Sequence, residues 1–224
     1  MGPEKLWPDP EPDTFFLERC LRQKGYQWVG GLDEVGRGPL AGPVVAACVI
    51  LAESSDHSVF VDSKTVRPEK RASLYRELQN NGAKIGVGIV SETDIDRLNI
   101  LQASLLAMKK AVLAMPLQPE FLLVDGTQPI PMTIPQQTLV KGESKSASVA
   151  AASIIAKVVR DELMDQYHLQ YPQYNFQQNR GYPTLEHRQA IKIHGPCDIH
   201  RRSFKCVKEF IANVSPKKRT GSTG

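Results

Sequence analysis

Carboxylates at the ends of two apolar segments are the side chains best suited to do chemistry. Asp33 and Glu34 lie in the segment GLDEVGRGPLAGP, and Asp125 ends the apolar run of FLLVDG. Because successive side chains of a strand point to opposite faces, one of the two adjacent acids should point toward a buried face. A buried carboxylate needs a compensating cation, which is either a Lys or Arg side chain or a metal ion.

Both segments have the form of a strand that delivers a carboxylate to one edge of a sheet. Open α/β sheets bind ligands outside the strand ends, and ligand sets made only of oxygen suit Mg²⁺ or Mn²⁺ rather than zinc. The sequence therefore predicts a hard-metal site at Asp33, Glu34 and Asp125. The alternative, that each acid caps a turn or pairs with a nearby arginine, explains one acid more readily than all three.

The length and composition are those of one globular domain with a sizeable core. The chain has 224 residues, of which 41% are hydrophobic and 23% charged, and its net charge is +4. It shows no apolar run long enough for a transmembrane span or a secretory signal, and its cysteines have no paired spacing. We expect a cytoplasmic monomer with one domain at residues 14–214, a loosely ordered lead-in at 1–13 and a flexible basic tail at 215–224.

The elements that would position the acids are runs rich in β-formers, followed by alternation with helical patterns. Strands are predicted over residues 27–35, 44–51, 84–90, 121–124 and 133–140. Helices are predicted over residues 14–23, 68–79, 99–115, 144–167, 184–194 and 203–214. This order indicates an α/β fold with a mixed sheet covered by helices.

Five motifs, taken in order, resemble the motif series of bacterial ribonuclease HII. They are GLDEVGRGPLAGP, FLLVDG, KGESKSASVAAASIIAKVVRDELM, NRGYPTLEH and HGPCDIHRRSF, and they run from about Gly31 to Phe204. The resemblance implies a ribonuclease H-like fold, with a mixed five-stranded sheet flanked by helices and a small helical C-terminal extension. Ribonuclease HIII resembles the same core but carries a longer N-terminal domain, for which the 32 residues before Asp33 are too few.

The family's metal-binding carboxylates correspond to Asp33, Glu34, Asp125 and Glu143 of the KGES motif. The family more often has Asp at the last position, so the longer Glu143 would reach a metal differently or through a water. Asp161 in VVRDE is a second acidic candidate, with an ion pair or cap within a long helix as the alternative. Four carboxylates around two Mn²⁺ or Mg²⁺ ions match two-metal phosphodiester hydrolysis.

The resemblance implies an endoribonuclease that cuts the RNA strand of RNA/DNA hybrids. It also implies cutting 5′ of single ribonucleotides embedded in duplex DNA, which leaves 5′-phosphate and 3′-hydroxyl ends and serves DNA repair. From a different class, the chain could be a catalytically silent binder of RNA/DNA hybrids, although four retained acids argue against this. Binding to a replication clamp has no support, because residues 217–224 are basic and then small and show no clear clamp motif.

Substrate contacts are expected from segments around the acids. The resemblance assigns Gly36, Arg37 and Gly38 to reading the 2′-hydroxyl that distinguishes RNA from DNA, where the alternative is a simple tight turn. It assigns Tyr182 to packing on the sugar after the ribonucleotide, where the alternative is an ordinary packing residue. Lys64 in the DSK motif contacts phosphate or lies in a surface turn.

The basic C-terminal segment is expected to bind phosphates or to form a solvated face. Within it, Arg201 and Arg202 are interpreted as phosphate contacts that position a duplex. A zinc site in the same segment is disfavoured, because zinc ligands usually show tighter paired spacing. Its ligands would be His194, Cys197, His200 and Cys206.

Overall fold

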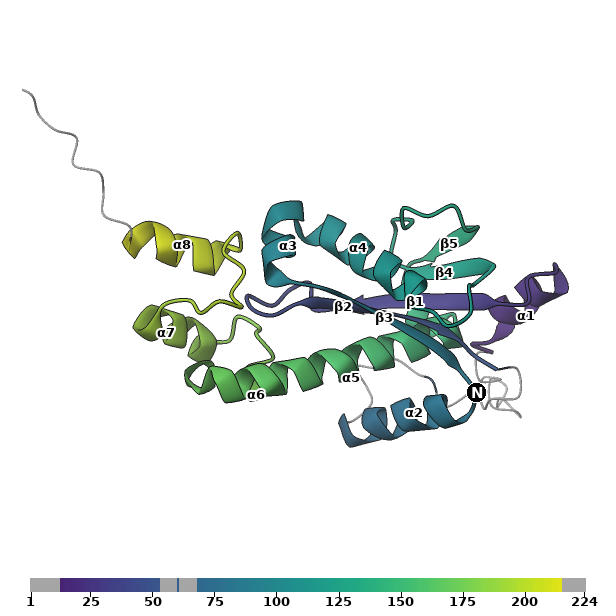
Figure 1. The fold of residues 1–224 in the computed structure, drawn as a ribbon, viewed down its shortest axis with the longest axis horizontal. Coiled ribbons are helices and arrows are strands. Elements are labelled where there is room, and N and C mark those ends of the chain that lie inside the picture. The colour runs from purple at the N-terminus through teal and green to yellow at the C-terminus, as the bar shows by residue number, and fades with distance from the viewer. Residues whose placement is uncertain (1–12, 53–59, 61–67, 215–224) are drawn as a thin grey trace, which may run out of the picture.

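A five-stranded mixed sheet forms the centre of the protein (Figure 1). The computed structural model describes residues 13–52, 60 and 68–214. The strand order is β3-β2-β1-β4-β5, with antiparallel pairing among β1 to β3 and parallel pairing of β4 with β1 and β5. The strands span Val29–Val35 (β1), Val44–Ile50 (β2), Lys84–Val90 (β3), Phe121–Asp125 (β4) and Gln136–Leu139 (β5). The predicted α/β fold with a mixed five-stranded sheet is confirmed.

The parallel pair of β1 and β4 determines where the acids lie. Their register places Leu32 opposite Val124, so Asp33 and Asp125 are the next residues of adjacent strands. Leu32 and Val124 have no exposed surface, which anchors both strands in the core just before the carboxylates. Strands that run in the same direction end at the same edge, so the two acids converge there.

Helices cover both faces of the sheet (Figure 1). One face packs against α3 (Glu92–Leu98) and α4 (Ile100–Leu113), and the other packs against α5 (Ala147–Gln170) and α2 (Pro68–Asn80). Alternate residues of β2 enter the two cores, which is why this strand is apolar throughout.

A glycine sets the distance between β1 and α5. A Cβ on Gly31 would lie 2.2 Å from the carbonyl carbon of Ser148, a separation that two carbon atoms cannot adopt. On the adjoining turns of α5, Ala147 and Ala151 have small side chains and are fully buried. Small residues on both elements therefore let the helix backbone rest directly on the strand, which brings the later turns of α5 to the edge that carries the acids.

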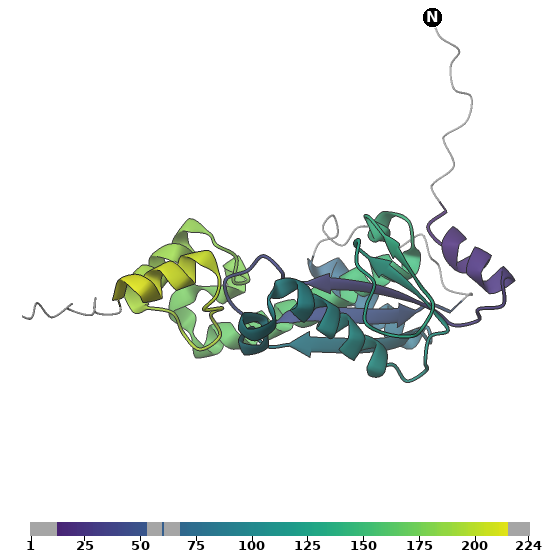
Figure 2. The same cartoon turned by 90° about the horizontal axis from the view of Figure 1, so that it is seen from above.

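The C-terminal helices form a lobe beyond one end of the sheet, whereas α1 (Phe16–Gln23) lies at the opposite end (Figure 2). The lobe contains α6 (Phe176–Asn179), α7 (Leu185–His194) and α8 (Lys205–Val214), together with the short 3-10 turn η3 (Pro172–Tyr174). Buried side chains from these elements form their own cluster. This lobe is the small helical C-terminal extension that the resemblance to ribonuclease HII implies.

Several elements differ from the predicted boundaries. α3 was not predicted as a helix, although Ser91 caps it by accepting a hydrogen bond from the Asp94 N–H. The long helix α5 begins at Ala147, where the preceding Ser146 is the cap, and it continues to Gln170 rather than ending at 167. β1 begins two residues later than predicted, and β5 occupies only half of the predicted range 133–140.

The predictions for the two chain ends fall largely outside the residues that the structure describes, the first of which is 13 and the last 214. The single domain at 14–214 therefore stays a prediction, as do the loosely ordered lead-in and the flexible tail. Among the described helices, none has the length and apolar character needed to cross a membrane.

Candidate active site

The four predicted carboxylates line one pocket at the edge where β1 and β4 end. Asp33 and Glu34 come from β1, Asp125 ends β4, and Glu143 lies in the 3-10 turn η2 (Gly142–Ser144). The remaining lining residues are Val35, Ser153, Lys157 and Tyr182. Residues far apart in the chain thus converge on one small polar surface.

A backbone hydrogen bond fixes the turn that carries the fourth acid. The Gly142 N–H donates to Asp125 Oδ1 at 2.7 Å, so the end of β4 holds the start of η2. A Cβ on Gly142 would lie 3.1 Å from the same oxygen, which is tighter than most Cβ contacts. Lys141 and Gly142 therefore determine where Glu143 lies. Lys141 turns the chain with a φ of 56°, and Gly142 lets the backbone approach the Asp125 carboxylate closely.

Burial and mutual repulsion disfavour the charged forms of the two acids on β1. Burial raises the pKa of Asp33 well above its ordinary value, and the carboxylates of Glu34 and Asp125 raise it further. Burial also raises the pKa of Glu34, although the Arg37 guanidinium partly offsets this effect. A divalent cation in the pocket would stabilise the ionised form of both acids.

Glu34 offers the clearest sign that the pocket accepts a cation. Its Oε1 accepts a hydrogen bond from Arg37 Nη1 at 3.1 Å, whereas its buried Oε2 has no hydrogen-bond partner. A buried carboxylate oxygen without a partner is costly unless something else satisfies it. With four carboxylates lining the pocket, the donor set fits Mg²⁺ or Mn²⁺.

The fit rests on donor chemistry rather than on a preformed cage. Within residues 13–52, 60 and 68–214, no group of three or more His, Cys, Asp or Glu side chains is arranged so that it could hold a metal ion. The carboxylates therefore share a pocket in an open arrangement.

The predicted ribose-reading loop lies beside Tyr182. Gly36 has a φ of 97°, in the region that favours glycine, and a Cβ on Gly38 would lie 3.5 Å from Tyr182 Cε1. Tyr182 is 43% exposed and lines the carboxylate pocket, so part of this residue is open to solvent. Arg37 is also exposed, apart from its contact with Glu34. The structure therefore places Arg37 and Gly38 beside residues that line the acid pocket, whereas Gly36 is buried against Arg160.

The predicted phosphate contact at Arg201 needs correction. Arg201 has no exposed surface, and its guanidinium donates to backbone carbonyls of the loop that follows β1. It is therefore a buried structural residue in this conformation. Arg202 is exposed and stays a candidate for phosphate binding, while its backbone N–H donates to Asp96. Lys64 lies outside the described residues.

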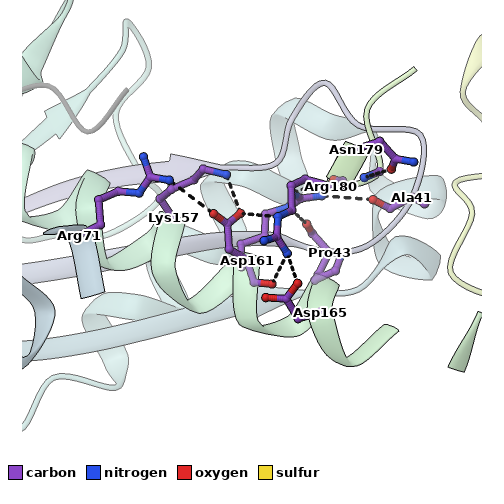
Figure 3. Close-up of polar contacts among 10 residues, drawn as sticks. Ala41, Pro43, Arg71, Lys157, Asp161, Asp165, Asn179 and Arg180 are labelled. Carbon is purple, nitrogen blue, oxygen red and sulfur yellow. Dashed lines mark hydrogen bonds and ion pairs between the residues drawn. The ribbon is translucent and has the colours of Figure 1, made fainter. Parts of the chain in front are cut away.

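Asp161 is engaged in ion pairs (Figure 3). Its carboxylate lies 2.5 Å from Lys157 Nζ, 3.7 Å from Arg71 Nη2 and 3.8 Å from Arg180 Nε. It lines a neighbouring pocket rather than the one that contains the four acids. The structure favours the ion-pair alternative for this residue.

Two pocket residues were missed by the sequence-based prediction. Ser153 and Lys157 are four residues apart on α5, so both project from one face of the helix toward the acids. Asp161 continues the same spacing. Ser153 and Lys157 are the polar residues of the otherwise apolar stretch 149–159 of this helix, and their i, i+4 spacing is the signal that could have identified them.

Two buried histidines of the C-terminal lobe are hydrogen-bonded to each other. His187 Nε2 and His200 Nε2 are 3.0 Å apart, and His187 Nδ1 lies 2.9 Å from the Tyr182 carbonyl oxygen. Burial lowers the pKa of both imidazoles, that of His200 to about 3, so both are neutral. Cys197 and His200 both belong to the disfavoured zinc set, and Cys197 Sγ lies 3.1 Å from His200 Nδ1.

The comparisons with known proteins agree with this geometry. The family model described as Ribonuclease HII matches residues 30–207. Ribonuclease HII from Desulfotalea psychrophila is 55% identical over 209 residues, which are 92% of each chain. The crystal structure of ribonuclease H2 from Pyrococcus horikoshii superposes with a TM-score of 0.70 at 25% identity, over 83% of this chain and 97% of that one.

A further solved structure shares the fold and was determined with a metal. Bst-RNase HIII in complex with Mn²⁺ gives a TM-score of 0.63 at 21% identity, over 96% of this chain and 77% of that one. The matched family segment contains all four pocket acids and the loop beside Tyr182. The chain belongs to the ribonuclease HII family and is a metal-dependent endoribonuclease.

Proposed function

We propose that the chain hydrolyses the RNA strand of RNA/DNA hybrids and cuts 5′ of single ribonucleotides in duplex DNA. The products are 5′-phosphate and 3′-hydroxyl ends, and the biological role is ribonucleotide removal during DNA repair. The observation that carries the proposal is the single pocket that joins four carboxylates to Tyr182, with Gly38 against the tyrosine ring.

Asp33, Glu34, Asp125 and Glu143 would hold two Mn²⁺ or Mg²⁺ ions, which when bound supply an activated water and stabilise the leaving 3′-oxygen. The unpartnered Oε2 of Glu34 and the mutual repulsion of the acids support this assignment. The Mn²⁺ complex of the structurally similar Bst-RNase HIII supports the choice of metal.

Other side chains would bind and orient the substrate. Lys157 Nζ, held at 2.5 Å by Asp161, lines the pocket as a cation and would offset the charge of the scissile phosphate. Gly38 allows the backbone to approach a ribose without an intervening Cβ, so its polar groups could bond to the 2′-hydroxyl. Gly36, whose Cβ side faces Arg160, would contribute by giving this loop its shape. The exposed Tyr182 ring would pack on the next sugar, where it leaves little space for a second 2′-hydroxyl.

A cleavage assay with a DNA duplex that contains one ribonucleotide tests the proposal. We expect a cut on the 5′ side of the ribonucleotide that requires Mn²⁺ or Mg²⁺. The variant Asp125→Asn should lose turnover by well over tenfold, the scale for removing a catalytic carboxylate. The matched control Asp198→Asn, an exposed acid in the C-terminal lobe, should retain it.

The alternative of a catalytically silent hybrid binder makes a different prediction for the same assay. Such a protein would bind the duplex in chelator and would show no cleavage after Mn²⁺ is restored. Binding to a replication clamp stays untested, because residues 215–224 lie outside the described part of the chain.

A further inference from the structure

Two buried arginines lie under the loop that follows β1. Arg160 on α5 and Arg201 after α7 both have no exposed surface. A charged side chain is rarely buried unless its donors are satisfied, because removal of an unpaired charge from water is costly. The hydrogen-bond partners of these two guanidinium groups therefore indicate which structural role the buried charges serve.

Arg201 donates almost entirely to one stretch of backbone. Its Nη2 bonds to the carbonyl oxygens of Gly36 at 2.6 Å and Gly42 at 2.8 Å, its Nη1 to that of Arg37 at 3.1 Å, and its Nε to that of Gly42 at 2.9 Å. Its own N–H donates to the Leu40 carbonyl at 2.8 Å. The Arg201 side chain thus links residues near both ends of loop 36–43.

Arg160 completes the set from the other side. Its Nε donates to the Pro43 carbonyl at 3.0 Å, its Nη2 to that of Ala41 at 3.2 Å, and its Nη1 to that of Arg180 at 3.1 Å. Figure 3 shows Ala41 and Pro43 close to Arg180, in the network around Asp161. The Arg180 bond joins the loop to the NRGYP segment that carries Tyr182.

The loop and the arginines fit together closely. A Cβ on Gly36 would lie 2.4 Å from Arg160 Nε and 2.8 Å from the Pro43 carbonyl oxygen. The planar guanidinium presents five N–H donors in a fixed fork, a geometry that a lysine ammonium cannot reproduce. The carbonyls of Gly36, Arg37, Ala41, Gly42 and Pro43 are all bound by these two forks.

Retaining both charges is unfavourable by itself. Burial lowers the pKa of Arg160 to about 10, and burial together with repulsion by Arg160 lowers that of Arg201 to about 9. Apolar residues of similar volume would fill the space without this penalty, but they would leave the loop carbonyls without donors.

We propose that Arg160 and Arg201 are positioning residues that hold loop 36–43 and the Tyr182 segment in the shape that distinguishes a ribonucleotide from a deoxynucleotide. This inference rests on the proposed function. It adds that ribose discrimination depends on two side chains that do not reach the substrate.

The test uses Arg160→Lys and Arg201→Lys in the full chain, with Arg76→Lys as the matched control. Arg76 is exposed on α2 and donates within its own helix to the Ala72 carbonyl. Dissociation constants are measured with Ca²⁺ in place of Mn²⁺, for a duplex with one ribonucleotide and for the same duplex made only of DNA. Turnover on the first duplex is then measured with Mn²⁺.

For the two loop variants we expect the preference for the ribonucleotide duplex to fall toward one and kcat to fall by about tenfold or more, the loss expected when charged hydrogen bonds are removed. The affinity for the all-DNA duplex should stay near that of wild type, a split that simple unfolding would not produce. Variants that keep both the preference and kcat would overturn the inference. Wild-type protein that neither prefers nor cuts the ribonucleotide duplex would instead overturn the proposed function.

A second measurement covers variants that fail to fold. In wild-type protein, hydrogen exchange of the Arg Nε–H groups is followed by NMR. Arg160 and Arg201 should exchange far more slowly than Arg76, because their bonded Nε–H groups are buried, whereas the Nε–H of Arg76 makes a longer, exposed bond. Exchange as fast as that of Arg76 would show that the loop is not held in this way.

Discussion

Lys157 and Asp161 form an ion pair one turn apart on α5, with 2.5 Å between Nζ and Oδ1. Only Lys157 lines the pocket of the four acids, while Asp161 is surrounded by Arg71 and Arg180 as well. Burial lowers the pKa of Lys157, and its hydrogen bond to Asp161 opposes this shift. Asp161 therefore favours the charged form of the lysine and holds its side chain in place.

This pair predicts that Asp161→Asn weakens turnover only partially. We expect kcat on the single-ribonucleotide duplex to fall by about three- to tenfold, because the lysine loses its anchor while all four pocket acids remain. Lys157→Met should lose more, since it removes the cation itself. A loss for Asp161→Asn as deep as that of Asp125→Asn would instead mark Asp161 as a metal ligand.

Removal of the metal should reveal the strain among the pocket acids. A buried acid whose pKa is raised in the folded state favours its neutral form there, so stability is lost as pH rises from the ordinary pKa through the raised one. At neutral pH in chelator, Asp33→Asn should therefore raise Tm by about 2–4 °C, the shift that 1 kcal/mol gives in a domain of this size. Thermal melts of both proteins check this.

Added Mn²⁺ provides the control for that melt. It should raise the Tm of wild-type protein through mass action, because it binds the folded pocket. It should raise the Tm of Asp33→Asn much less. Equal metal stabilisation of the two proteins would contradict the role of Asp33 as a ligand.

Two glycines of the loop should respond differently to substitution by alanine. A Cβ on Gly36 would strike Arg160, and the positive φ adds strain, so Gly36→Ala should lower both Tm and activity. A Cβ on Gly38 would make only an ordinary 3.5 Å contact with Tyr182, so Gly38→Ala should keep Tm close to wild type and lower cleavage.

Differential scanning calorimetry and cleavage rates of the two variants separate these outcomes. If Gly38→Ala destabilised the protein as much as Gly36→Ala does, then Gly38 would serve the turn rather than the substrate.

The neutral pair of His187 and His200 predicts a loss of stability in acid. His187 Nδ1 lies 2.9 Å from the Tyr182 carbonyl and so carries a proton, which leaves its Nε2 to accept from His200. The pKa of His200 is lowered from 6.5 to about 3, so its contribution is present above pH 6.5 and is lost as pH falls toward 3.

Urea unfolding between pH 7 and 5 checks this slope. We expect a decrease of up to about 1.4 kcal/mol for each pH unit from this one group. His200→Gln should show a shallower dependence, because glutamine cannot gain the proton. An unchanged slope in that variant would assign the acid sensitivity to other groups.

Asp33, Glu34 and Asp125 could be located from the sequence, because an acid that ends an apolar strand must lie at the edge of the sheet where that strand ends. The sequence was insufficient for Lys157, whose place in the pocket depends on how α5 docks on β1 through Gly31. That docking is a tertiary distance, and the spacing of residues in one helix does not contain it.

The prediction that Arg201 contacts phosphate was wrong for a different physical reason. Charged residues usually lie at the surface, so an RR pair in a basic segment favours a phosphate contact. The burial of Arg201 depends on carbonyl groups of a loop that lies far away in the chain, and backbone acceptors leave no trace in residue types. Its neighbour Arg202 follows the ordinary rule and is exposed.

The parallel pairing of β1 with β4 has a consequence for how the enzyme becomes active. Parallel neighbours require a crossover, and here β2, β3 and three helices (α2, α3 and α4) intervene before the second acid-bearing strand, β4, is reached. Such high contact order makes the pairing slow relative to local structure. On the ribosome, β1 would therefore be synthesised long before β4 could pair with it and complete the nuclease site. In a refolding experiment, the return of cleavage activity would report that this pairing is complete.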